Sequence, residues 1–356
     1  MASNSIHNLK EGSGSAAQAV LERLGHLAVG EGMAHERMVV FPLFAAAQGT
    51  SAPKPRVLAY RTLGQAIAEG AVQVKERPSA SVPELVIHNQ GQAVVLIVDG
   101  EEIVGGQQNR VVNTSFLIGA QTEMLLPVTC VEHGRWHHTS DTFSSGEYSY
   151  HKLRASKYEQ VTKSYRSTGR PLADQGEVWA EVAERESITG SHSPTGAMHE
   201  IYQTRDHDLS AYEKAFPYAA GAVGMLVALS GEVAGVDLFD QPDTAQTFWN
   251  KLLRSYALDA LVGERSEVGE PVTHQHATRF LEAARGTRSE VYPSVALGEE
   301  VRLEGDEVFG GGLVYEETPV HISLFRSQKE QRTGRSARAR WEAQQRLQPQ
   351  EEQSQE

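Results

Sequence analysis

The sequence predicts an α+β protein with a largely antiparallel β-sheet core, a helical insertion and packed helices in its C-terminal half. Short apolar, β-branched runs dominate residues 27–131, helical spacing dominates about 140–217, and strand-like runs return near the C-terminus. A sheet that takes strands from both ends of the chain explains this order, so we expect residues 16–327 to form a single domain. The alternative is two domains that divide within 140–217.

The predicted elements follow in order along the chain. Residues 1–15 are rich in Ser, Asn and Gly and are expected to be disordered, and AAQAVLERL then has the spacing of a short helix. Strands are expected at 38–44, 72–76, 84–88, 93–98, 110–118 and 123–131, with a helix at 62–70. Two helical patterns lie in the insertion, at 150–165 and 177–188. A strand pair is expected at 222–239, with its turn at Ser230-Gly231. Two helices follow, one with Asp243 as its expected N-cap and one at 273–286. Strands at 301–326 then precede a tail (328–356) that is expected to be disordered or loosely helical.

Composition limits the classes of function. The formal charge of −13 makes a nucleic-acid partner unlikely, because affinity for phosphate depends on clustered Lys and Arg. No apolar run reaches the length of a membrane span, and the N-terminus lacks the pattern of a signal peptide. Cys130 is the only cysteine, so no internal disulfide can form. We therefore expect a cytoplasmic protein that does not bind a membrane.

Two polar segments stand out against the strand pattern. In residues 94–118, Asp99-Gly100 predicts a tight hairpin turn, whereas the unbroken run Gly105 to Arg110 has no role in a sheet. Paired glycines with amide and arginine donors suit a phosphate, carboxylate or sugar, although a glycine bulge before a solvated strand is an equal reading. The second segment, CVEHGRWHH, follows a strand; its residues Glu132, His133, His137 and His138 could bind a metal but lack a typical ligand spacing. Cys130 is expected to be a buried structural thiol.

Three strings resemble a bacterial domain family named for its association with ADP-ribosylglycohydrolases and rhodanese-phosphatases. They are DGEEIVGGQQNRVVN, LPVTCVEHGRW and TFWNKLLRSYALDAL, and the resemblance spans about residues 20–326. It implies a place in the metabolism of NAD-derived or ADP-ribosylated compounds, an inference from associated proteins rather than from a site. It also implies that ADP-ribose-processing enzymes are possible partners.

The resemblance and the residue chemistry select the same side chains. Glu102 and Glu132 are the candidate general acids or bases, because hydrolysis at a glycosidic or phosphate centre needs a placed proton carrier. We assign no metal ligand and no cofactor. The candidate ligand-binding residues are Gln107, Gln108, Asn109, Arg110, Asn113, Arg135 and Trp136.

The resulting hypothesis is a protein that binds or hydrolyses an anionic small molecule, namely an NAD-derived, ADP-ribose-like or other phosphorylated nucleotide-sugar metabolite. A non-enzymatic protein-interaction module is the alternative, and a metal-dependent hydrolase is a weaker one. Arg110 and Arg135 in one deep pocket with Glu102 and Glu132 would favour the first hypothesis, whereas an open, flat arrangement would favour the second.

Overall fold

The computed structural model describes residues 14–46, 57–77, 83–135, 137, 139–140, 142–262 and 271–327. Expectations for the N-terminal residues up to 13, for Trp136 and His138 and for the tail after Ser327 lie outside these ranges. Among the described residues, no helix is long and apolar enough to span a membrane. The helices of this part of the chain are α1 (Ser15–Gly25), α2 (Leu63–Ala68), α3 (His151–Thr168), α4 (Gln175–Thr189), α5 (Met198–Thr204), α6 (Asp206–Ala215), α7 (Pro242–Ala260) and α8 (His274–Arg285).

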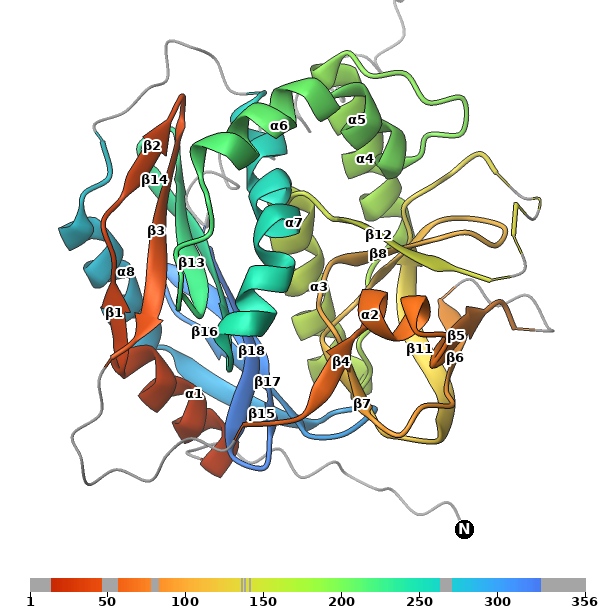
Figure 1. Ribbon diagram of the computed structural model, residues 1–356, viewed down its shortest axis with the longest axis horizontal. Helices are drawn as coiled ribbons and strands as arrows, with labels where there is room; N and C mark the ends of the chain where they lie inside the picture. Colours follow the sequence, from red (N-terminus) through yellow and green to blue (C-terminus); the bar gives the residue numbers. More distant parts are fainter. Residues whose placement is uncertain are drawn as a thin grey trace, which may run out of the picture.

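The largest sheet combines strands from both ends of the chain, as Figure 1 shows in red and blue. Its strand order is β1-β3-β13-β14-β18-β17-β16-β15, with β2 paired to β3, and every pairing in it is antiparallel. We call it the large sheet. Its strands are β1 (Leu27–Val29), β2 (Met33–His35), β3 (Met38–Ala45), β13 (Gly224–Leu229), β14 (Glu232–Phe239), β15 (Arg288–Pro293), β16 (Glu299–Glu304), β17 (Val308–Tyr315) and β18 (Thr318–Arg326).

Residues 60–148 form two smaller sheets on the other side of the molecule. One has the order β10-β7-β4, in which β4 and β7 are parallel, and the other has the order β12-β8-β9-β11-β6-β5. Their strands are β4 (Tyr60–Thr62), β5 (Val72–Lys75), β6 (Glu84–Asn89), β7 (Val94–Ile97), β8 (Glu101–Val104), β9 (Arg110–Val112), β10 (Phe116–Ile118), β11 (Thr122–Cys130) and β12 (Ser144–Tyr148).

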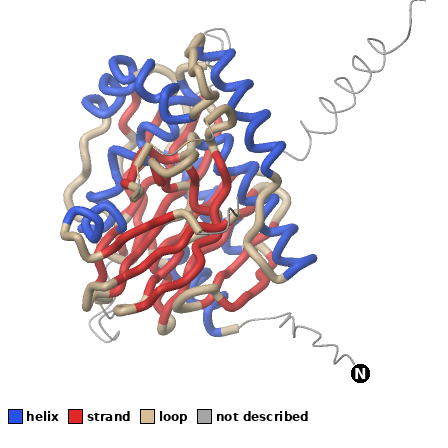
Figure 2. The backbone as a smooth tube through the Cα atoms, turned by 90° about the vertical axis from the view of Figure 1, so that its right-hand side faces the viewer, coloured by secondary structure: helices blue, strands red, loops and turns tan. Residues whose placement is uncertain are grey.

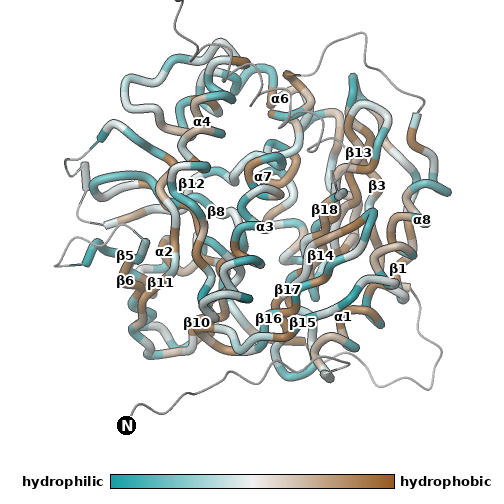
Figure 3. Tube along the Cα trace, turned by 180° about the vertical axis from the view of Figure 1, so that it is seen from behind, coloured by the Kyte–Doolittle hydropathy of each residue, from teal (hydrophilic) through white to brown (hydrophobic). Residues whose placement is uncertain are grey.

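Hydrophobic packing joins these layers. One face of the large sheet packs against α1 and α8, and an apolar core that includes Ile97, Ile103 and Phe116 lies between the two smaller sheets and α2. The third core connects α3 to α7 with the opposite face of the large sheet, and Trp249 of α7 is 1% exposed within it. Seen from the side, strands run through the body and helices lie around it (Figure 2). In Figure 3 the strands of the large sheet are mostly hydrophobic and the outer turns hydrophilic.

Of three predicted turns and caps, one is confirmed, one is confirmed in part and one is wrong. Ser230-Gly231 joins β13 to β14 with positive φ angles of 50° and 86°. The turn at Asp99-Gly100 forms, with the Glu101 amide donating to the carbonyl of Val98, but it is not a hairpin, because β7 and β8 pair in different sheets. The N-cap of α7 is Gln241 rather than Asp243, because Pro242 takes the first helical position, where its missing N–H has no cost.

Candidate functional site

The polar run Gly105 to Asn109 is the loop of a hairpin, because Ile103 pairs with Arg110 and Glu102 pairs with Val111. Gly105 and Gly106 have φ angles of 139° and 55°, which side-chain-bearing residues rarely adopt. A Cβ on Gly106 would lie 2.4 Å from the Phe143 ring. The paired glycines therefore serve a tight loop rather than a bulge within a strand.

Glu132 and Arg135 meet this loop in a closed network. Arg135 Nε and Nη2 donate to the two carboxylate oxygens of Glu132 at 2.8 and 2.6 Å, and Nη2 also donates to Asn109 Oδ1 at 3.0 Å. Its Nη1 donates to the carbonyl of Gly106 at 2.6 Å and to Thr139 Oγ1 at 2.7 Å. Each guanidinium nitrogen thus has partners, so an anion could bind Arg135 only by displacing these bonds.

The same network fixes the ionisation of Glu132. Burial opposes its charge, but hydrogen bonds from Arg135, from the Asn109 amide and from the Thr195 hydroxyl lower the pKa of Glu132 below its usual value. A carboxylate that is held ionised and accepts four hydrogen bonds is a poor proton carrier. In this geometry Glu132 anchors Thr195, and through it the loop that precedes α5.

The remaining ligand-binding candidates lie around this network or away from it. Arg110 is 3% exposed; its Nη1 donates to the carbonyl of Gln108, and its Nη2 lies 3.5 Å from a Glu76 oxygen, which also accepts from the Gln107 amide. Asn113 lies elsewhere and joins Thr129 to the carbonyl of Pro171. The structure thus brings Gln107 to Arg110 together with Glu132 and Arg135, but pairs them with one another.

Glu102 belongs to a different arrangement, a dyad with His199. Glu102 is 0% exposed on β8, and its Oε2 lies 2.8 Å from Nδ1 of His199, on α5. The His199 side chain is 27% exposed, and within the described residues no hydrogen bond involves its Nε2. The hydrogen bond that His199 donates to the Glu102 carboxylate raises the pKa of His199 above its usual value, against partial desolvation, and the charges of Glu102, Glu147 and Glu200 add to the rise.

The neighbours of this dyad hold it in place. The backbone amide of Glu147 donates to Glu102 Oε2 at 3.2 Å, and a Cβ on Gly146 would come within 2.5 Å of the same oxygen. Arg254 of α7 neutralises Glu147 and also contacts Asp206, at the start of α6. A buried carboxylate that fixes one nitrogen of a partly exposed imidazole is the usual construction of a histidine general base.

A second cluster of ionisable groups is buried between the large sheet and α3. The register Asp237↔Ser323, Ser323↔Gly311 and Gly311↔Arg302 places polar side chains in one row across four strands. Arg154 and Lys157 of α3 cover this row; Arg154 is paired with Asp237, and Lys157 Nζ donates to Asp99 Oδ1 at 2.8 Å. Arg154 lowers the pKa of Asp237 far below its usual value despite complete burial. We call the set the buried polar cluster; it comprises Asp99, Thr114, Ser115, Arg154, Lys157, Asp237, Glu300, Arg302, His321 and Ser323.

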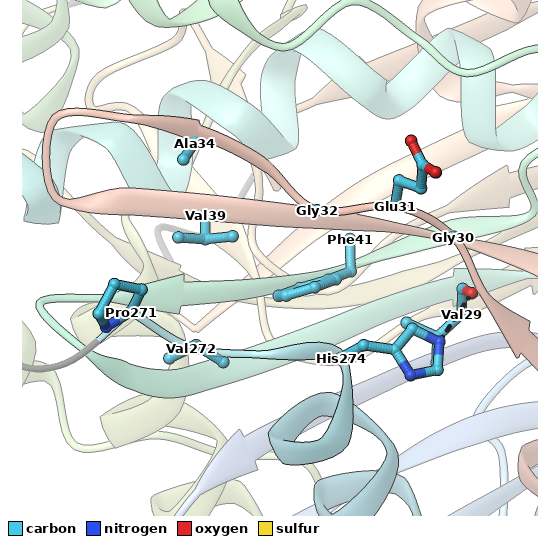
Figure 4. A pocket seen from close by; sticks show the side chains of 10 residues that line it. All are labelled: Val29, Gly30, Glu31, Gly32, Ala34, Val39, Phe41, Pro271, Val272 and His274. Carbon is cyan, nitrogen blue, oxygen red and sulfur yellow. Dashed lines mark hydrogen bonds between the residues drawn. The ribbon is translucent and has the colours of Figure 1, made fainter.

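The largest of the cavities we describe, about 530 Å³, has little chemistry to offer. It is a shallow groove in which Val39 and Phe41 of β3 face Pro271 and Val272, and Glu31 points away from these apolar side chains (Figure 4). His274 is bonded to the carbonyl of Val29 at 3.1 Å. No cluster of three or more His, Cys, Asp or Glu side chains suited to a metal occurs in the described ranges.

Sequence reasoning missed His199 and the buried polar cluster. His199 is the second residue of α5 and belongs to no recognisable motif, and its partner Glu102 lies 97 positions earlier. The cluster left a weak signal, since β18 alternates His321 and Ser323 with apolar residues, and β17 carries three successive glycines. The alternation in β18 and the glycines in β17 can be interpreted only when the pairing of these strands is known.

Comparison with protein families gives one result that covers most of the chain. Residues 26–325 match the model of the ARG and Rhodanese-Phosphatase-superfamily-associated Protein domain. Comparison with curated proteins and with solved structures gave no significant match. The matched region begins directly after α1 and ends one residue before the last strand does, so it includes the Glu132–Arg135 network, the Glu102–His199 dyad and the buried polar cluster. The chain therefore belongs to the ARG and rhodanese-phosphatase-superfamily-associated protein domain family.

Proposed function

We propose that the protein is a hydrolase that acts on an NAD-derived, ADP-ribose-like or other phosphorylated nucleotide-sugar metabolite, with His199 as its general base. The observation that carries the proposal is the Glu102–His199 dyad, in which a fully buried carboxylate orients a partly exposed imidazole. Glu102, expected to transfer the proton itself, here positions the histidine that does so.

The proposed reaction uses Nε2 of His199, the ring nitrogen that is not bonded to Glu102. A water molecule passes one proton to Nε2 of His199 while its oxygen bonds to the electrophilic centre of the substrate. The leaving group departs with the electron pair of its bond to that centre, and the imidazolium then gives its proton to the leaving group. Glu102 stabilises the imidazolium formed between these steps, as the direction of the His199 pKa shift requires.

The charges around the dyad favour cleavage at a glycosidic centre. Glu102, Glu147 and Glu200 all favour positive charge at His199, and of these Glu147 is paired with Arg254, so the negative charge at the dyad comes mainly from Glu102. Breaking a glycosidic bond gives the sugar carbon an oxocarbenium-like transition state, whose developing positive charge such a negative charge stabilises. Displacement at an anionic phosphorus centre would gain nothing from the same carboxylate.

The test is a hydrolysis assay with His199→Gln. The purified chain would be incubated with NAD, ADP-ribose and related nucleotide sugars, and the products separated by chromatography. Removing the general base should lower kcat by about 10²- to 10⁴-fold. His207→Gln is the matched control, because the His207 side chain is fully exposed on α6 and should leave kcat unchanged. Hydrolysis by His199→Gln at the wild-type rate, or no turnover of any member of the panel by the wild type, would refute the proposal.

A further inference from the structure

Strand β12 has a bulge opposite Glu102, the buried half of the dyad. The strand register shifts between Ser145 and Tyr148. Gly146 and Glu147 therefore lie opposite a single residue of β8, Glu102. A bulge releases a backbone amide from the ladder and redirects the side chains around it. Here the amide of Glu147 donates at 3.2 Å to Glu102 Oε2, the oxygen that also bonds to the histidine of the dyad. The bulge is thus part of the support of the dyad.

Arg254 of α7 fixes this bulge through the side chain of Glu147. Its Nε and Nη2 bond to the two carboxylate oxygens of Glu147 at 3.2 and 3.1 Å, the parallel geometry that a guanidinium offers and an ammonium does not. Its Nη1 donates to Asp206 Oδ1 at 3.0 Å and to Glu213 Oε1 at 3.4 Å, both on α6. Arg254 is 8% exposed, so water screens these bonds less than those of a surface ion pair.

The same guanidinium contacts the helix that carries His199. Its carbon Cζ lies over the ring of Tyr202, 6.0 Å from the ring centroid, which is the outer range of a cation–π contact. Tyr202 is 0% exposed and lies three positions after His199 on α5, so the two side chains are neighbours on the helix surface. Arg254 therefore contacts β12 beside the carboxylate of the dyad and α5 beside its imidazole.

We propose that Arg254 is the positioning residue of the dyad, which holds the bulge of β12 and helix α5 at the separation at which Glu102 and His199 form their hydrogen bond. Its role in catalysis rests on the proposed function, whereas its effect on the hydrogen bond does not. A displacement of about 1 Å between catalytic groups can cost about 10²-fold in rate. The 2.8 Å contact between Glu102 Oε2 and His199 Nδ1 thus depends on a side chain whose own hydrogen bonds go to other residues.

The charge of Arg254 and its positioning role predict opposite effects on His199. The groups whose charges favour protonated His199 are Glu102 on β8, Glu147 on β12 and Glu200 on α5. If Arg254 only neutralised Glu147, its removal would restore that negative charge, and the pKa of His199 would rise. If Arg254 positions the dyad, its removal weakens the hydrogen bond to Glu102, which is the largest cause of the raised pKa, and the pKa of His199 falls. The direction of the change therefore separates the two roles.

Nitrogen-15 NMR titration of the His199 ring in the wild type and in Arg254→Met measures this direction. We expect the titration midpoint of Arg254→Met to lie roughly 1 pH unit below that of the wild type. Arg166→Met is the matched control, because Arg166 also bonds to two carboxylates, those of Glu290 and Glu304, but joins α3 to the large sheet. It should leave the His199 midpoint unchanged. A midpoint that stays or rises in Arg254→Met, or that falls equally in the control, would overturn the proposal.

Arg254→Lys remains informative if Arg254→Met fails to fold. Lysine keeps the charge but cannot make two parallel bonds to Glu147. The His199 midpoint should again fall, and kcat on a nucleotide sugar that the wild type hydrolyses should decrease by up to about 10²-fold. An unchanged midpoint would refute the positioning role, and a lowered midpoint with an unchanged kcat would refute its part in catalysis. If the wild type hydrolyses no compound of the panel, the proposed function fails, but the His199 midpoints still decide the role of Arg254.

Discussion

Arg135→Ala should destabilise the fold, because Arg135 neutralises a carboxylate inside the protein. The side chains of Arg135 and Glu132 are 9% and 4% exposed, and they share two hydrogen bonds of 2.8 and 2.6 Å. After the substitution Glu132 keeps only the Asn109 amide and the Thr195 hydroxyl as donors. Removing one partner of a buried ion pair costs about 3–5 kcal/mol, which for a chain of this size lowers Tm by roughly 4–8 °C.

Urea unfolding at neutral pH measures this cost. The matched control is Arg279→Ala, because the Arg279 side chain is 73% exposed and its ion pair with Glu307 is 3.5 Å long. An exposed pair of this kind contributes about 0–1 kcal/mol. If Arg135→Ala lost no more stability than the control, the network would not be structural. A simultaneous loss of ADP-ribose binding would then make Arg135 a ligand-binding residue, as the sequence suggested.

Three other substitutions test further features. Glu102→Gln should move the NMR titration of His199, and the rise of activity with pH, to lower pH, because the carboxylate raises the pKa of His199. Glu200→Gln is the control and should shift the His199 titration less, because Glu200 is the weakest of the named influences on that pKa. Equal shifts in the two variants would contradict the dyad. Cys130→Ser should lower the free energy of unfolding in urea by about 1–3 kcal/mol, because it buries a hydroxyl group. A thiol reagent should react slowly with the wild type, because burial raises the pKa of Cys130 to about 11. Fast reaction of the folded protein would disprove that Cys130 is a buried structural thiol. Gly311→Ala should lower Tm more than Gly221→Ala, because a Cβ at residue 311 would lie 1.9 Å from the Val301 carbonyl oxygen. A Cβ at residue 221 would have no atom within 4 Å, so that substitution adds only about 1–2 kcal/mol of backbone strain. Equal losses of Tm would show that β17 accommodates a side chain.

Features encoded by local patterns could be predicted from the sequence alone. Apolar spacing predicted α3, α4 and α7, and the turn at Ser230-Gly231 followed from the residues that tolerate positive φ. The fold class followed because strand-like runs at both ends of the chain need each other to bury their faces. The polar character of the Gly105 to Arg110 loop and of Glu132 and Arg135 was also recognised as more than a sheet requires, and the structure brings these residues together, although Asn113 lies elsewhere.

The tertiary structure decided which strands pair and which polar groups neutralise each other. Asp99-Gly100 makes a turn, but nothing in its residues says that β7 and β8 separate into different sheets. Likewise, Glu102 lies next to Glu101 in sequence, yet its partner His199 arrives from a helix 97 positions away. The row from Asp237 to Arg302 takes one polar side chain from each of three strands, with Gly311 between them. Such contacts depend on strand register and on long-range packing. Their free energy depends on both segments at once, so the sequence pattern of either segment alone does not predict them.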